Sequence, residues 1–257
     1  MPSWSVQAWD AIRGGYAMPC CVRRLKKAVR WNLVSRNVCD GAQAPGISTK
    51  EIQPLTAEQA STLLATAKGD RLEALYVAAV TTGMRLGELF GMQWADVDLP
   101  NGAILVRHAL QELNGKLTLT EPKTAKSRRR VELPKLAIDA LREHRKRQFA
   151  AGHMASGFVF TNTEGGPLRR SHFHRGDYKP LLTKAGLPEI RFHDLRHTAA
   201  TLLLLAGVHP EIVRDRLGHS KIGITIDLYS HVLPSMQKEA AGRLDSLLSA
   251  KAEAKAG

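Results

Sequence analysis

The chain has 257 residues, 44% hydrophobic and 5% aromatic, and this composition excludes a fibrous or disordered protein and predicts a globular one with its own core. Its 37 Lys and Arg residues outnumber its 24 Asp and Glu residues, and the resulting net charge of +13 favours a nucleic acid partner over a merely basic soluble protein. The three cysteines form no CxxC pair and no apolar run reaches the about 20 residues of a membrane span, which argues against a disulfide framework, a zinc site and a membrane protein.

The first 50 residues contain one predicted helix and a linker. Residues 20–34 form a basic amphipathic helix, whose apolar stripe consists of Val22, Leu25, Val29 and Leu33. Its candidate DNA-binding cations are Arg23, Arg24, Lys26 and Lys27. Residues 35–50 are rich in turn-forming residues and predict a linker to the domain that follows.

A larger domain is predicted from residue 51 onward, and it begins with helices. Thr56, with Gln59 three residues later, matches a capping box and predicts a helix over residues 57–67. Two further helices are predicted over residues 71–82 and 85–92, and the glycine between them ends the first.

The period of the hydrophobic pattern changes after residue 100. Asn-Gly pairs and a basic stretch separate three predicted strands, at residues 103–106, 117–120 and 130–133. Helices return at residues 135–149, 177–185, 194–206, 210–217 and 235–249, and the last of them is amphipathic. The pattern predicts a mainly α-helical domain with one small three-stranded antiparallel sheet.

Arg85 and Glu88 are the first candidate functional pair. Arg85 follows Gly83 near the start of a helix, and Glu88 lies three residues later, so that the two side chains share a helix face. A guanidinium group beside the free N–H groups of a helix start is suited to bind an anion. The alternative is a surface ion pair that contributes little, and the segment alone favours this alternative.

A basic stretch over residues 121–130 connects two of the predicted strands. Its candidate cations are Lys123, Lys126, Arg128 and Arg129. A hairpin with this charge is a natural contact for DNA phosphates, and the alternative is a solvated basic turn.

His193, Arg196 and His197 form a third candidate cluster. His193 and Arg196 are three residues apart and face the same way on a predicted helix, whereas His193 and His197 have a spacing that could hold a metal. The zinc-protease pattern needs Glu directly after the first His, but this chain has Asp194, which we interpret as a helix N-cap.

Two further candidates lie toward the C-terminal end of the chain. Gly218 is expected to end a helix, which places His219 just beyond it, and Tyr229 follows ten residues after this histidine. The alternative for Tyr229 is a partly buried packing residue, the usual role of tyrosine. Each candidate is a weak signal alone, but their order along the chain is specific.

The order Arg85, Lys123, His193-x-x-Arg196, Gly218-His219 and Tyr229 resembles that of the tyrosine recombinases of the phage integrase type. The resemblance includes the segments TGMRLGELFGMQWADVDL, HDLRHTA and LGHSKIGITIDLY, and it extends from about residue 51 to residue 248. It implies a tyrosine recombinase catalytic fold for residues 51–257, and it makes residues 1–50 a remnant of a core-binding domain plus a linker.

The resemblance implies a site-specific DNA recombinase or integrase. Tyr229 would attack a DNA phosphodiester and form a 3′-phosphotyrosyl intermediate. Arg85, Arg196 and His219 would stabilise negative charge, His193 would act as the base, Lys123 as the acid, and Glu88 would support Arg85 or His193. Neither a metal nor another cofactor is implied, because fixed cations take the place of the metal ion and the covalent bond stores the energy.

The short N-terminal part departs from the family, whose full-length members carry a core-binding domain of about a hundred residues. We therefore expect weak, salt-sensitive binding to double-stranded DNA, and the alternative is a truncated, catalytically impaired integrase that acts only as a DNA-binding protein. A homo-tetramer on DNA would use the helix over residues 235–249, and the location would be cytoplasmic and nucleoid-associated. Two competing enzyme classes are a metal-dependent phosphohydrolase and a type IB topoisomerase.

Overall fold

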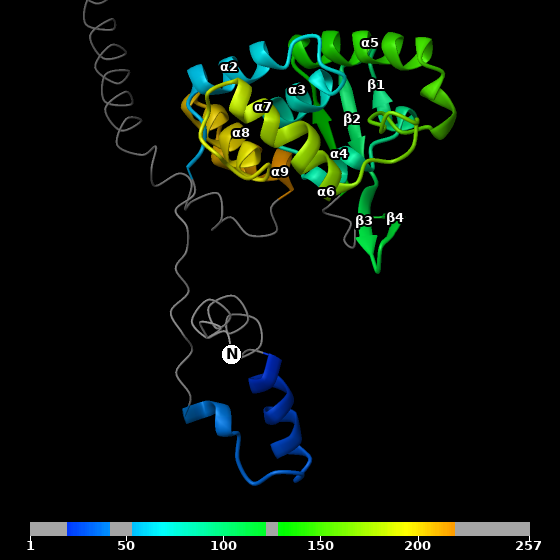
Figure 1. The fold of residues 1–257 in the computed structure, drawn as a ribbon. Helices are drawn as coiled ribbons and strands as arrows, with labels where there is room; N and C mark the ends of the chain where they lie inside the picture. Colours follow the sequence, from blue (N-terminus) through cyan, green and yellow to red (C-terminus); the bar gives the residue numbers. More distant parts are fainter. Residues whose placement is uncertain (1–19, 42–52, 122–127, 219–257) are drawn as a thin grey trace, which may run out of the picture. The chain divides into compact units, whose positions relative to one another are not determined.

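The computed structural model describes residues 20–41, 53–121 and 128–218 of the chain (Figure 1). The chain divides into two compact units, residues 1–51 and residues 52–257. In the first unit, residues 20–30 form a helix and Val38–Gly41 form the 3-10 helix η1. The helix ends at residue 30 rather than at residue 34, so Leu33, which we expected on its apolar stripe, lies beyond it and is 70% exposed.

The second unit contains the helices that the hydrophobic pattern predicts up to residue 217. Its α-helices are α2 (Ala57–Thr66), α3 (Glu73–Thr82), α4 (Leu86–Phe90), α5 (Lys135–Ala150), α6 (Arg170–Phe173), α7 (Lys179–Lys184), α8 (Asp194–Leu205) and α9 (Pro210–Leu217). The helix predicted over residues 177–185 begins earlier, because the π-helical turn η5 (His174–Tyr178) joins α6 to α7. The structure also has the 3-10 helices η2 (Trp94–Asp96) and η4 (His153–Ser156).

The first helix of the second unit begins as its sequence predicts. The capping box of α2 is confirmed, because Gln59 N donates to Thr56 Oγ1 at 3.2 Å and Thr56 N donates to Gln59 Oε1 at 3.0 Å. The amphipathic helix predicted over residues 235–249 lies outside the described residues. Within the described ranges, no helix combines the length and the apolar character needed to cross a membrane.

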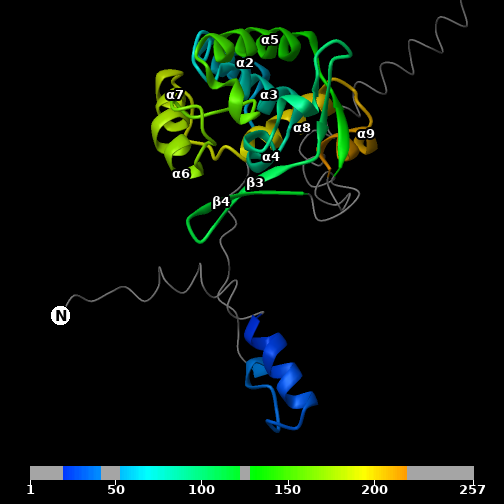
Figure 2. The same cartoon turned by 90° about the vertical axis from the view of Figure 1, so that its right-hand side faces the viewer.

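The predicted three-stranded antiparallel sheet is present, with a different set of strands. β1 (Val97–Asp98), β2 (Ala103–Val106) and β5 (Arg129–Glu132) pair in the order β1-β2-β5. β3 (Ala109–Leu113) and β4 (Lys116–Thr120) form a separate antiparallel hairpin, which projects from the helices in Figures 1 and 2. The strand predicted over residues 117–120 therefore belongs to the hairpin, and β1 takes its place in the sheet.

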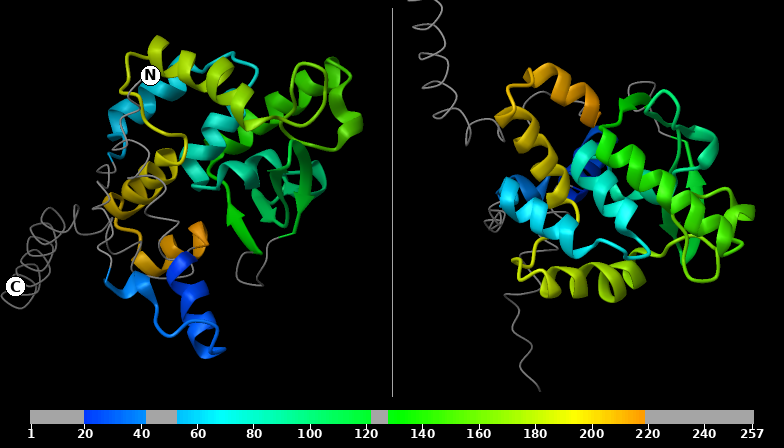
Figure 3. Two further views of the ribbon diagram at one scale, coloured as in Figure 1. Left: turned by 60° about the horizontal axis from the view of Figure 1, so that its bottom comes forward. Right: turned by 90° about the horizontal axis from the view of Figure 1, so that it is seen from above.

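Helix α3 lies at the centre of the second unit. It packs against α5 and against α8, and every residue from Ala74 to Val80 is buried. A helix that is apolar on all its faces is typical of the middle of a core. The run of α6, η5 and α7 lies on one side of this core and α9 lies on the other, as Figures 2 and 3 show.

The end of α3 brings distant segments together. Gly83 ends α3 with a φ of +64°, a left-handed conformation that glycine adopts without steric penalty. A Cβ atom at Gly83 would lie 2.3 Å from Leu217 Cδ2, so the side chain of Leu217 on α9 would have to shift. Gly218 ends α9 in the same left-handed region, with a φ of +70°. The first residues after α3 and the last residues of α9 therefore lie next to each other.

Candidate active site

Three arginines from separate segments converge on the C-terminal end of α9. Arg129 Nε donates to the carbonyl of Arg216 at 2.7 Å, Arg196 Nη2 to that of Leu217 at 2.7 Å, and Arg85 Nη2 to that of Gly218 at 3.0 Å. These arginines lie on β5, on α8 and in the turn between α3 and α4. The last carbonyls of a helix have no partner within the helix and carry partial negative charge, so guanidinium groups are suited to bind them.

Glu88 connects two of these arginines. Its Oε1 pairs with Arg85 Nη1 at 2.8 Å, and its Oε2 pairs with Arg129 Nη2 at 2.8 Å. Oε2 also accepts a hydrogen bond from the backbone N–H of Arg85 at 2.9 Å, at the start of α4. Glu88 is only 6% exposed. Burial by itself would raise the pKa of this carboxyl, but Arg129 and Arg85 outweigh burial and hold its pKa below the ordinary value, so Glu88 is charged at pH 7.

Arg196 is the most deeply buried of the three, at 2% exposed. Its Nη1 donates to the carbonyl of Gly83 at 2.7 Å, beside the bond to Leu217. Burial and the nearby charge of Arg85 lower the pKa of Arg196 to about 9, which leaves the group positively charged at pH 7. The two guanidinium groups of Arg85 and Arg196, on adjacent carbonyls, form a positive centre suited to an anion.

His193 and His197 lie at the start of α8, on the same side of the helix. Their ring centroids are 5.2 Å apart, with the rings nearly perpendicular. His193 is exposed. Partial loss of hydration, reinforced by His197 and Arg196, lowers the pKa of His193 to about 4. His193 is therefore neutral at pH 7 and can accept a proton from a bound molecule.

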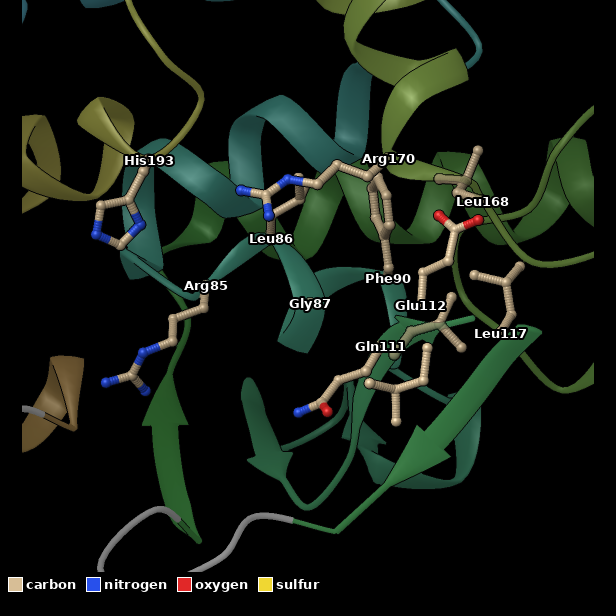
Figure 4. A pocket seen from close by; sticks show the side chains of 12 residues that line it. Arg85, Leu86, Gly87, Phe90, Gln111, Glu112, Leu117, Leu168, Arg170 and His193 are labelled. Carbon is tan, nitrogen blue, oxygen red and sulfur yellow. The ribbon is translucent and has the colours of Figure 1, made fainter. Parts of the chain in front are cut away.

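Arg85 and His193 line one end of a cavity of about 510 Å³. Figure 4 shows the two side chains next to each other, with Arg170 beyond them. The apolar part of the wall includes Phe90 and Leu117, the latter from the β3–β4 hairpin. This volume is in the range of sites that bind small organic groups, and its cationic end is suited to a phosphate.

Asp194 does not cap α8 as we predicted. Its carboxylate turns back to Arg191, where Oδ1 pairs with Nη2 at 2.8 Å and Oδ2 accepts from the backbone N–H at 2.9 Å. Among the residues that the structure describes, no group of three or more His, Cys, Asp and Glu side chains could hold a metal ion. The hypothesis of a metal-dependent phosphohydrolase built on His193, Asp194 and His197 therefore has no support in this part of the chain.

Apart from Arg129, the remaining predicted site residues are either outside the described residues or exposed on the surface. Those outside the described residues are Lys123, Lys126, His219 and Tyr229. Those that are exposed on the helix over residues 20–30 are Arg23, Arg24, Lys26 and Lys27. Arg128 is exposed just before β5 and forms an ion pair with Glu121.

Arg129 is not the exposed DNA contact that we expected. Its side chain is 6% exposed, and Glu88 and the carbonyl of Arg216 bind its guanidinium group. Its place in the site was not predicted, because in the sequence Arg129 is one of several cations in a basic turn. The signal was the alternation of β5, which puts Arg129 on the same side as the buried Val131.

The model of the phage integrase family matches residues 53–236. A tyrosine recombinase XerC-like protein of Caldanaerobacter subterraneus is 34% identical over 244 residues, which cover 86% of this chain and 62% of the relative. The ICEBs1 integrase of Bacillus subtilis is 31% identical over 229 residues, with the same two coverages of 86% and 62%. The chain thus spans about 62% of the length of these curated relatives.

Solved structures share the fold. The Tn1549 transposon integrase, in complex with a circular intermediate DNA, superimposes with a TM-score of 0.72 at 24% identity, covering 84% of this chain and 76% of that one. A lambda integrase dimer bound to a core site gives a TM-score of 0.59 at 18% identity, covering 82% and 70%. The mainly helical fold with small antiparallel sheets is therefore the fold of these catalytic domains.

Proposed function

Because the chain belongs to the phage integrase family of tyrosine recombinases, we propose that it breaks and rejoins DNA at specific sites through a covalent bond between Tyr229 and a 3′ phosphate. The observation that carries this proposal is the meeting of Arg85 and Arg196 on the adjacent carbonyls of Leu217 and Gly218. Two forked cations at one point are the arrangement that a phosphoryl group with developing negative charge requires.

The first step exchanges one phosphate ester for another. The Tyr229 oxygen attacks the phosphorus atom, a bond to Tyr229 forms, and the bond from phosphorus to the 5′ oxygen breaks. Arg85 and Arg196 stabilise the extra negative charge on the nonbridging oxygens, with His219 as a third donor. In the second step a 5′ hydroxyl of another strand attacks the phosphotyrosyl bond and releases Tyr229, so no external energy source is needed.

Two protons move in this first step. A phenol has a pKa of about 10, so Tyr229 needs a base, and His193 is assigned that role because it is neutral at pH 7 and lies beside Arg85 in the cavity. Lys123 is assigned as the acid that protonates the departing 5′ oxygen. Glu88 orients Arg85 through its ion pair, a supporting role.

Binding of the DNA duplex itself is assigned to cations outside this cluster. Arg128 and Lys126 lie beside Lys123 in the sequence, and the basic face of the helix over residues 20–30 supplies further phosphate contacts. Assembly of a homo-tetramer on DNA through the predicted helix over residues 235–249 is part of the same proposal.

Covalent trapping on DNA of randomised sequence tests the proposal. The purified chain is incubated with a pool of duplexes that carry a single-strand nick within the randomised region, and adducts that survive SDS are isolated. We expect an adduct in EDTA, and peptide mapping should locate it at Tyr229. Tyr229→Phe should form none while still binding the pool. Binding without any adduct from the wild-type chain would instead support the alternative of a DNA-binding protein without catalysis.

A further inference from the structure

We propose that Arg129 is a positioning residue that holds Arg85 and the end of α9 in the geometry needed for DNA cleavage. It does so through Glu88 and through the carbonyl of Arg216, and it does not touch the DNA itself. This inference rests on the proposed function, in which Arg85 binds the phosphate.

The guanidinium group of Arg129 connects Glu88 to the end of α9. Its Nη1 and Nη2 donate to the two carboxylate oxygens of Glu88, at 3.2 and 2.8 Å, and its Nε donates to the carbonyl of Arg216 at 2.7 Å. A guanidinium group is planar, so these bonds fix the direction of Glu88 relative to α9. Both side chains are almost completely buried, at 6% and 7% exposed, so water does not compete for these bonds.

The position of Glu88 determines that of Arg85. Arg85 is 42% exposed, so packing restrains it less than its bonds do. Those bonds run to Glu88 Oε1 and to the carbonyl of Gly218. Arg129 fixes the first partner directly, and it fixes the second through the neighbouring end of α9. Without Arg129, the buried carboxylate would lose one of its two cations and the bonds that fix its direction, so Arg85 would no longer have a fixed partner.

Arg129 also joins the two segments that lead to the remaining proposed catalytic groups. It stands at the first position of β5, in the same basic stretch of the sequence as Lys123. The carbonyl of Arg216 lies two residues before Gly218, which precedes His219. Arg216 strengthens this connection, because its Nη2 donates to the carbonyl of Glu132 in β5 at 2.8 Å and to that of Thr81 in α3 at 3.1 Å.

Trapping kinetics with the nicked pool test the inference. For Arg129→Gln we expect the rate of adduct formation at saturating DNA to fall by about 10- to 100-fold, while the affinity for the pool changes less than about threefold, because a misplaced group affects the transition state more than binding. Arg129→Lys should recover part of the rate, since it keeps the charge without the fork. Arg130→Gln is the matched control, because this neighbour pairs with Glu132 on the exposed side and should react as wild type.

A rate for folded Arg129→Gln within about twofold of wild type would overturn the inference, as would equal losses of rate and affinity. A second measurement remains valid if the wild-type chain forms no adduct, in which case the proposed function fails and the positioning role is tested alone. In side-chain ¹⁵N spectra, Arg85 should give separate Nη signals, identified by their loss in Arg85→Lys. These signals should merge in Arg129→Gln, and unchanged signals would contradict the positioning role.

Discussion

Gly83→Ala should destabilise the second unit more than a glycine-to-alanine substitution whose only effect is backbone strain. Gly83 has a φ of +64°, so an L side chain is strained there, and its added Cβ would lie 2.3 Å from Leu217 Cδ2. The strain of the left-handed conformation is roughly 1–2 kcal/mol. Overpacking a tight core contact adds roughly 1–3 kcal/mol. We expect a total loss of roughly 2–5 kcal/mol in the free energy of unfolding.

Gly69→Ala separates the two contributions. Gly69 has a φ of +79°, but a Cβ atom there would meet nothing within 4 Å, so only the backbone strain of roughly 1–2 kcal/mol applies. Urea unfolding of the full chain, followed by circular dichroism, measures both losses. A drop of roughly 2–4 °C in Tm for each kcal/mol provides a check by heating.

The difference between the two variants isolates the contact between α3 and α9. If Gly83→Ala and Gly69→Ala lose the same free energy, within about 0.5 kcal/mol, this contact contributes nothing and Leu217 moves aside freely. If only Gly83→Ala also slows adduct formation, the displacement has reached the carbonyl of Leu217, which binds Arg196.

Three further predictions concern the site and its charge. In protein that remains folded, Arg196→Lys should slow adduct formation by about 100-fold or more, because one ammonium group cannot reach a phosphate as well as the carbonyls of Gly83 and Leu217. A loss of rate below about fivefold would contradict the role of Arg196 in stabilising the phosphate. His197→Gln should move the acidic limb of the cleavage rate to higher pH, because burial and His197 together lower the pKa of His193 to about 4 and this pKa rises when His197 is removed; an unmoved limb would contradict the assignment of His193 as the base. Replacing both Arg23 and Arg24 by Gln should reduce the slope of log affinity against log salt by about 2, measured by fluorescence anisotropy, and an unchanged slope would mean that they touch no phosphate.

The helices and the polar candidate site residues could be predicted from local signals in the sequence. The period of apolar residues predicted α2 to α5, α8 and α9, and Gly83 marked the end of α3 because a left-handed residue is a local requirement. Arg85 and Arg196 were singled out by their order in the sequence, and the structure brings them to adjacent carbonyls. Spacing alone could not give this contact, since it depends on where α9 packs.

The strands and the buried polar contacts could not be predicted in full, because they depend on pairing between segments that are distant in the sequence. β3 reads ALQEL and has one buried residue, Leu110, so it has no alternation that would mark it as a strand. Arg129 is one cation among several in the sequence, and only the pairing of β5 with β2 and the arrival of α9 bury it. Asp194 has the composition of an N-cap, but Arg191 three residues earlier offers it a stronger, charged partner.

The three guanidinium groups at the end of α9 are in place before a phosphate binds. Because backbone carbonyls and Glu88 already hold them, folding itself creates the cationic centre, and no reorganisation of side chains is required when a phosphate arrives. The electric field of the site is thereby a property of the folded chain and not of the complex. A substitution that loosens α9 should therefore weaken anion binding even in the absence of DNA, and titration with inorganic phosphate can detect this.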